Sequence, residues 1–235
     1  MSRLWVYLAA SPLLWLTATL LAYQAGMWVF RRAGQRPIAH PVPLAVGALI
    51  VLLRATGTDY DTYFAGAQFV HFLLGPATVA LAVPLYQNRA EVRRALLPMV
   101  SALLAGSAVA VLSAVGIAAA LGASGETVAS IAPKSVTAPI AMAISEQIGG
   151  QPSLTAAMVI ATGILGAVMA TPLLNLLGVR DWRGRGLAAG VAAHGLGTAR
   201  AFQVNPLAGT FAGIALGLNG LVTAVLVPLL ARLWR

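Results

Sequence analysis

Long apolar runs separated by short polar clusters dominate the chain. Runs rich in Leu, Ala and Val occupy residues 4–30, 41–53, 62–86, 96–121, 127–148, 152–177, 187–202 and 207–230. A helix that crosses a bilayer needs roughly 20 apolar residues, and most of these runs are about that long. The pattern predicts an all-α polytopic membrane protein that forms a single integral membrane domain over residues 1–235. No cleavage site separates the first run from a polar region, so we expect it to be retained as a span.

Most arginines lie between the runs, in clusters at residues 31–36, 89–94, 180–185 and 232–235. Positive residues accumulate in cytoplasmic loops, so we expect all four clusters on the cytoplasmic side. Asp59, Asp61 and the turn at 122–126 then lie on the other side. Neighbouring clusters must be separated by an even number of crossings, yet three runs lie between residues 96 and 179. We therefore expect 127–148 to be a broken or re-entrant segment, which leaves about seven net crossings.

A weak internal repeat favours broken helices. Residues 75–79 resemble residues 132–136, and each copy is followed by a second proline, Pro84 or Pro139. The two copies extend over 72–121 and 129–178. Carriers built from inverted repeats bring paired interrupted helices together at the membrane midplane. The repeat therefore predicts an inverted-repeat, transporter-like core, although an Ala- and Gly-rich chain also produces such similarity by chance.

Lys134 is the only lysine of the chain, and it lies in an apolar run. An ionisable residue within the membrane is costly to insert and usually has a function. The alternatives are a side chain that reaches the interface, or a pair with Glu146. Twelve residues of continuous helix would separate Lys134 from Glu146 by about 18 Å, which excludes a local pair.

The residues around Lys134 favour a site for a small anion. Proline suits the first turn of a helix, where free N–H groups and hydroxyls attract negative charge. A proline-kinked packing helix is the alternative. The predicted substrate-binding residues here are Pro133, Lys134, Ser135, Val136 and Thr137, faced by Pro76, Ala77 and Thr78 of the repeat partner.

A second polar segment runs from His194 to Arg200. Its glycines, Gly195 and Gly197, allow close backbone approach, and Thr198 adds a hydroxyl. Arg200 could hold a carboxylate through two parallel hydrogen bonds, or anchor the chain at the interface. His194 could exchange a proton near neutral pH, or serve only in packing. We include this segment in the predicted substrate site.

The composition agrees with a membrane protein. Hydrophobic residues make up 59% of the chain and charged residues only 9%, against roughly 25% charged in a soluble domain. The net charge of +9 comes from arginines between apolar runs, so we expect topology signals and no nucleic-acid partner. The absence of cysteine excludes disulfides and thiolate metal sites.

Sequence motifs of common enzymes are missing. The chain has neither a Gly-Lys-Ser/Thr loop nor a Gly-x-Ser-x-Gly elbow, so we expect no enzyme and no ATP-driven pump. His40 and His71 are far apart and poor in nearby carboxylates, so no metal site or cofactor is expected. A carrier would couple to H⁺ or Na⁺, with Glu146 and His194 as the candidate coupling residues.

Three motifs, in order, resemble the LrgB/CidB family. They are the string Phe72–Ala82, the Pro133–Ile140 string with the Ile148-Gly149-Gly150 turn, and the string His194–Ala201. The resemblance covers about residues 40 to 230. Relatives often carry two acidic residues after the last motif, where this chain has Gln203 and Ala208. They also often have serine before the histidine, where Ala193 stands here.

The resemblance implies a multi-pass protein of bacterial inner membranes with a small LrgA/CidA-type membrane protein as its partner. The family has been described both as antiholin-like modulators of murein hydrolases and as carriers of small carboxylates. The plastid glycolate/glycerate translocator of plants is similar, with an LrgA-like and an LrgB-like half.

Two functional hypotheses follow. The first is a secondary transporter of a small monocarboxylate such as glycolate, glycerate, pyruvate or lactate, bound at crossed half-helix N-termini. The alternative is an antiholin-like regulator of murein hydrolase activity and autolysis without transport of its own. Gly- and Ala-rich helices also favour a homodimer in the lipid bilayer.

Overall fold

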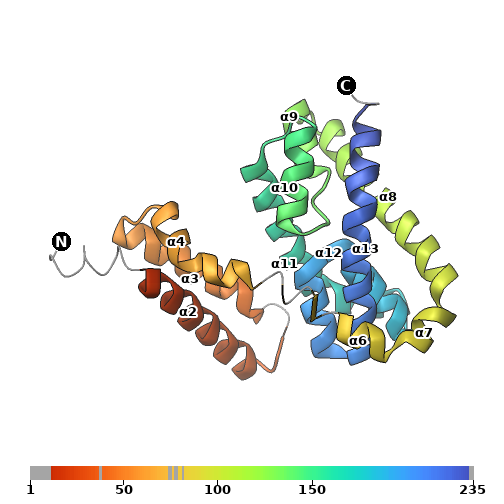
Figure 1. Cartoon of the computed structure of the whole chain (residues 1–235), viewed down its shortest axis with the longest axis horizontal. Coiled ribbons are helices and arrows are strands. Elements are labelled where there is room, and N and C mark those ends of the chain that lie inside the picture. The colour runs from red at the N-terminus through yellow and green to blue at the C-terminus, as the bar shows by residue number, and fades with distance from the viewer. Residues whose placement is uncertain (1–11, 37–38, 74–75, 77–78, 81, 233–235) are drawn as a thin grey trace. The chain divides into compact units, whose positions relative to one another are not determined.

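The computed structural model describes residues 12–232 except 37–38, 74–75, 77–78 and 81. Every element among these residues is a helix, as the apolar runs predict (Figure 1). The helices are α2 (Pro12–Arg32), α3 (Pro41–Thr56), α4 (Tyr60–Phe72), α6 (Ala82–Gln87), α7 (Arg89–Arg94), α8 (Leu96–Ala120), α9 (Gly125–Ile131), α10 (Ala138–Gln147), α11 (Pro152–Leu176), α12 (Trp182–Val204) and α13 (Pro206–Ala231). The chain divides into two compact units, residues 1–80 and 81–235, here called the N-terminal and C-terminal units. The single membrane domain expected over the whole chain stays a prediction.

Four of the described helices are long and apolar enough to cross a membrane: α2, α8, α11 and α13. They coincide with four of the predicted runs, which are thereby confirmed as candidate spans. α3 is apolar but only 16 residues long. The run at 62–86 does not form one helix, because α4 ends at Phe72 and α6 begins at Ala82.

In the N-terminal unit, α2 packs against both α3 and α4. Gly66 of α4 lies so close to α2 that an added Cβ would be 2.8 Å from the Cβ of Trp15. The Trp15 ring meets the Tyr63 ring edge to face, with 6.1 Å between centroids. The Tyr63 hydroxyl also lies 3.1 Å from the Thr19 hydroxyl, so aromatic packing and one polar contact join α2 to α4.

The C-terminal unit is built on α8, α11 and α13. Residues 89–94 and 180–185 lie at one end of it, where the Arg183 guanidinium is 3.6 Å from the Glu91 carboxylate. We call this the arginine-rich end. At the other end Ala231 of α13 packs in one cluster with Ala129 and Ile148. Figure 1 shows the same arrangement, with α6 and α7 at one end of the unit and α9 and the end of α13 at the other.

The predicted break in 127–148 is confirmed, because residues 132–137 separate α9 from α10. The chain also reverses there. The Thr155 hydroxyl on α11 donates to the Ser130 carbonyl oxygen at 2.9 Å and lies 2.7 Å from the Ser145 hydroxyl. A straight helix would separate Ser130 from Ser145 by roughly 22 Å. We call this element, with its tip at 132–137, the α9–α10 hairpin.

α12 differs from the prediction, which treated 187–202 as a crossing. Its backbone dihedral angles depart from helical values at Ala193 (φ −129°, ψ 17°) and His194 (φ 41°, ψ −130°). A Cβ on Gly197 would collide with the carbonyl oxygen of Ala189, whereas a straight helix would hold these residues roughly 12 Å apart. α12 is therefore a second hairpin, with a first arm at 182–193 and a second arm at 195–204. The structure consequently does not confirm the seven crossings.

The α12 hairpin also corrects the position of the last arginine cluster. A Cβ on Gly186, near the start of α12, would collide with the carbonyl oxygen of Ala208, near the start of α13. Arg232 follows the far end of α13, about 36 Å further along that helix. Arg232 therefore lies opposite the arginine-rich end, and the prediction that all clusters share one side is wrong for it. The reason is that α13 alone, and not two crossings, joins 180–185 to 232.

Candidate functional site

The two hairpins begin at opposite ends of the C-terminal unit, and their tips meet beside the middle of α13. The α9–α10 hairpin has its base at the end that holds Ala231, and the α12 hairpin has its base at the arginine-rich end. Local sequence explains the first tip. Pro133 has no N–H to continue α9, and Pro139 occupies the first turn of α10, for which Thr137 is the N-cap residue.

The second tip is held by His194. Its Nε2 lies 2.9 Å from the carbonyl oxygen of Val159 on α11, and since a carbonyl only accepts, Nε2 carries the proton. The Thr198 hydroxyl donates to the His194 carbonyl oxygen at 2.8 Å. A Cβ on Gly163 would lie 2.6 Å from the His194 ring, so α11 must have glycine there. The positive φ of His194 is unusual for a residue with a side chain, and these contacts maintain it.

Asn219 of α13 joins the two tips. Its Nδ2 donates to the Ser135 carbonyl oxygen at 3.1 Å and to the Val191 carbonyl oxygen at 3.2 Å. Its Oδ1 accepts a hydrogen bond from the Ser107 hydroxyl of α8. The side chain is only 1% exposed. Sequence reasoning missed Asn219, although a lone amide within the apolar run 207–230 is a signal of helix-to-helix hydrogen bonding in membranes.

A pocket of about 490 Å³ adjoins the first tip. Lys134 and Ser135 are its polar lining residues, and apolar residues of α8 and the first arm of α12 form its walls. The Lys134 Nζ donates to the Ser135 hydroxyl at 3.2 Å. Among the described residues no carboxylate lies within ion-pair distance of Lys134. The pocket thus holds a positive charge with an adjacent hydroxyl and mostly apolar walls, which suits a small organic anion.

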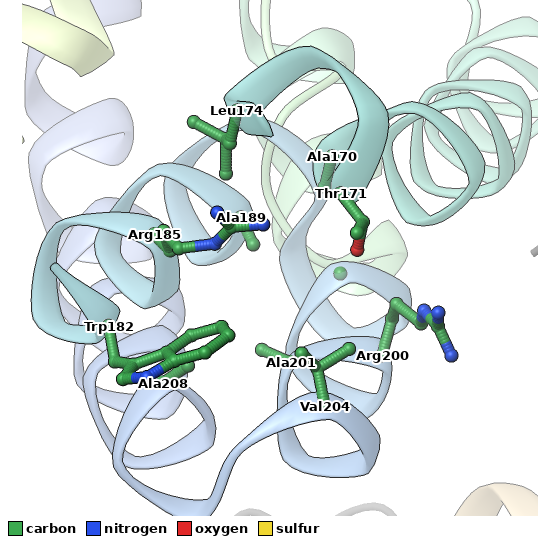
Figure 2. A pocket seen from close by; sticks show the side chains of 11 residues that line it. Ala170, Thr171, Leu174, Trp182, Arg185, Ala189, Arg200, Ala201, Val204 and Ala208 are labelled. Atoms are coloured by element: carbon green, nitrogen blue, oxygen red, sulfur yellow. The ribbon is translucent and has the colours of Figure 1, made fainter. Parts of the chain in front are cut away.

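Arg200 lies in a different place. It lines a small cavity between the two arms of α12 and α11, together with Arg185, Trp182 and Thr171 (Figure 2). The cavity volume of about 20 Å³ is close to that of one water molecule, too small for a carboxylate ligand. The Arg200 guanidinium donates to the Gln203 side-chain oxygen at 3.3 Å. The structure therefore does not bring Arg200 to Lys134.

The other residues predicted for substrate binding or ion coupling do not form one site: some lie at the two hairpin tips and others lie elsewhere. Val136 is buried among Ala141 and Val159, Gly195 is half-buried at the second tip, and Glu146 is exposed on α10. Ala77 and Thr78 lie outside the described residues, and Pro76 belongs to the N-terminal unit. The expected contact between the breaks at 76 and 133 therefore stays a prediction.

The arginine-rich end carries an ion-pair network. The Arg183 guanidinium lies 2.9 Å from the Asp181 carboxylate and also contacts Glu91, which accepts from Arg94 as well. Hydrogen bonds from Arg183 hold the pKa of Asp181 below its usual value. Asp181 is also the N-cap of α12, where its carboxylate accepts from the Arg183 backbone N–H at 2.9 Å. In the described part of the chain no three His, Cys, Asp or Glu residues gather as a metal site would require.

These features define an all-helical, multi-pass membrane protein with two interrupted segments that meet at a buried amide. The chain belongs to the LrgB-like family, which matches residues 19–233. No solved structure matches it.

Three relatives illustrate the similarity. A Haemophilus influenzae protein is 35% identical over 88% of this chain and 91% of its own length. The holin-like protein CidB of Staphylococcus epidermidis is 30% identical over 84% of this chain and 86% of its own length. The antiholin-like protein LrgB of Bacillus cereus is 30% identical, covering 93% and 95% of the two chains.

Proposed function

We propose that this chain acts as a holin-like or antiholin-like regulator in a bacterial inner membrane, where it modulates murein hydrolase activity and autolysis. One observation carries this proposal: two relatives that match 84% and 93% of this chain are named holin-like CidB and antiholin-like LrgB. A small LrgA/CidA-type membrane protein is the proposed partner. A regulator of this kind would act through assembly with that partner in the membrane.

The test is the rate of detergent-induced autolysis in a bacterium from which its own family member has been deleted. Expression of this chain is expected to change the lysis rate and the murein hydrolase bands on a zymogram. An expressed, membrane-inserted chain that leaves both unchanged would refute the proposal.

We propose a second candidate function, the carriage of a small monocarboxylate, which one structural observation favours. Lys134 and Ser135 lie at a hairpin tip beside a pocket of about 490 Å³. A regulator that acts only by assembly has little need for an ammonium group in an apolar run, because inserting it costs roughly 2.5–3.5 kcal/mol. In this function the Lys134 ammonium neutralises the carboxylate and the Ser135 hydroxyl binds a carboxylate or hydroxyl oxygen.

The arrangement of the hairpins supports the same candidate. Two hairpins that begin at opposite ends and meet at one residue resemble the paired interrupted helices of carriers that open a central site to either side in turn. The α12 hairpin lies outside both copies of the predicted repeat, 72–121 and 129–178, so that repeat stays a prediction. The coupling ion would be H⁺ or Na⁺. His194 is buried at the second tip, and Glu146 is exposed on α10, so the two coupling candidates occupy different environments.

Uptake of labelled glycolate or pyruvate into proteoliposomes tests the carrier function. Lys134→Gln keeps a polar side chain of similar length and is expected to abolish uptake. Arg232→Gln, at an exposed arginine opposite the arginine-rich end, serves as the charge-matched control. Equal uptake by Lys134→Gln and wild type would remove Lys134 from the mechanism. Measuring autolysis with Lys134→Gln separates the two functions, because a regulator that does not transport keeps its effect.

A further inference from the structure

The pocket at Lys134 continues into a second pocket. This second pocket, of about 470 Å³, lies at the arginine-rich end, where Arg94, Asp181 and Arg183 line it. Ala102, Gly184 and Leu187 line both pockets. Since three residues are common to the two linings, the pockets are adjacent and follow one another along α8 and the first arm of α12.

Small residues form two facing parts of the walls of this passage. Gly184, Ala188 and Ala192 follow one another at four-residue spacing, so they share one face of the first arm, and all three are exposed. Ala102, Gly106 and Ala110 repeat the pattern on α8, and each of the six residues lines at least one of the two pockets. At Gly184 an added Cβ would have no heavy atom within 4 Å. The passage is therefore open along these two faces, because no side chain on them is larger than a methyl group.

The charge along the passage favours anions. Residues 89–94 and 180–185 contain six arginines and two acids, a net charge of +4 at the outer end. The Asp181 and Glu91 carboxylates are already engaged by Arg183. Lys134 provides the positive charge at the inner end. A cleft with one sign of charge and apolar walls concentrates ions of the opposite sign.

We propose that the two pockets form one aqueous vestibule, through which a small monoanion reaches Lys134 from the arginine-rich side. The net positive charge of residues 89–94 and 180–185 attracts that anion to the outer end. Gly184, which lines both pockets, is the position where the passage can be closed. This inference rests on the carrier candidate for its purpose. The existence of the vestibule can be measured without any transport.

The chain has no cysteine, so a single introduced thiol can report on the passage. Ala188→Cys places a thiol on the wall between Gly184 and Ala192. The probe is an anionic, membrane-impermeant methanethiosulfonate, applied to inside-out membrane vesicles, because positive clusters mark the cytoplasmic face. Ala188→Cys is expected to react with it, whereas Val225→Cys, an exposed apolar position on α13, is not.

Closing the passage provides the decisive comparison. Gly184→Phe in the Ala188→Cys background is expected to abolish most of the labelling, because the ring would fill the open space beside Gly184, where an added Cβ has no heavy atom within 4 Å. Gly116→Phe is the matched control, because a Cβ at that α8 glycine also has open space around it and Gly116 lines neither pocket. The anionic reagent is expected to react faster than a cationic analogue, and Lys134→Gln is expected to reduce that preference.

Labelling of Ala188→Cys only by membrane-permeant maleimide, or labelling unaffected by Gly184→Phe, would overturn the vestibule. Labelling that behaves as expected, together with absent carboxylate uptake, would instead keep the vestibule and refute the carrier function.

Discussion

Asn219 in α13 donates a hydrogen bond of 3.1 Å to the backbone carbonyl of Ser135, at the tip of the α9–α10 hairpin. The same amide nitrogen reaches the Val191 carbonyl at the tip of the α12 hairpin. Two carbonyls freed by helix breaks thus share one buried donor, in a region where water would otherwise have to satisfy them. Asn219 consequently fixes the distance between the two tips.

Replacing Asn219 is expected to destabilise the C-terminal unit. Asn219→Leu leaves the Ser135 and Val191 carbonyls without their donor, which should lower the free energy of unfolding by about 1–3 kcal/mol. The measurement is equilibrium unfolding in mixed detergent micelles. Asn175→Leu, at an exposed position of α11, is the control and should change stability little. Equal effects of the two substitutions would contradict a joining role for Asn219.

Thr155 is expected to hold the α9–α10 hairpin closed through its hydroxyl. Thr155→Val keeps the side-chain shape but removes the hydrogen bonds to Ser130 and Ser145, at an expected cost of about 1–3 kcal/mol. Thr155→Ser retains the hydroxyl and should recover most of the loss. Thermal unfolding of the three proteins in one detergent provides the comparison, and identical melting temperatures for Val and Ser would disprove the role of the hydroxyl.

Alanine substitution at two glycines of the α12 hairpin, only two residues apart, should have opposite effects on stability. A Cβ at Gly197 would collide with the Ala189 carbonyl oxygen and lie 2.7 Å from the Ala193 Cβ, whereas a Cβ at Gly195 has no heavy atom within 4 Å. Gly197→Ala should cost about 1–3 kcal/mol through overpacking, and Gly195→Ala should be neutral or slightly stabilising. Yield of folded protein and thermal unfolding measure both effects. Tolerance of Gly197→Ala would argue that α12 does not fold back.

The ion pairs at the arginine-rich end should depend on pH. The pKa of Asp181 is lowered in the folded chain by hydrogen bonds from Arg183, so its carboxylate stabilises the fold above the unfolded pKa of about 3.9. This stabilisation is lost as the pH falls through the lower folded pKa. Asp181→Asn should therefore lower the melting temperature slightly at pH 6 and make no difference well below pH 4. The control is Asp61→Asn, an exposed acid in the N-terminal unit, and a difference for Asp181→Asn that persists in acid would contradict the mechanism.

The family and the long apolar helices were accessible from the sequence, and so was one of the two breaks. Long apolar runs fix α8, α11 and α13, because a bilayer-length apolar segment has few alternatives to a helix. Pro133 and Pro139 identify the break between α9 and α10, because proline cannot donate to the preceding turn. The motifs that contain these residues also indicated the LrgB-like family.

Only the tertiary structure decided which apolar segments cross and which turn back. The run 187–202 has the composition of a span, and it turns back at His194 because Gly190 and Gly197 fit against Ala212 and Ala189, contacts that hydropathy does not encode. The same reversal placed Arg232 opposite Arg185 and brought Val191 to Asn219. Local sequence sets helix formation through propensity and length, whereas chain reversal depends on close packing between residues far apart in the sequence.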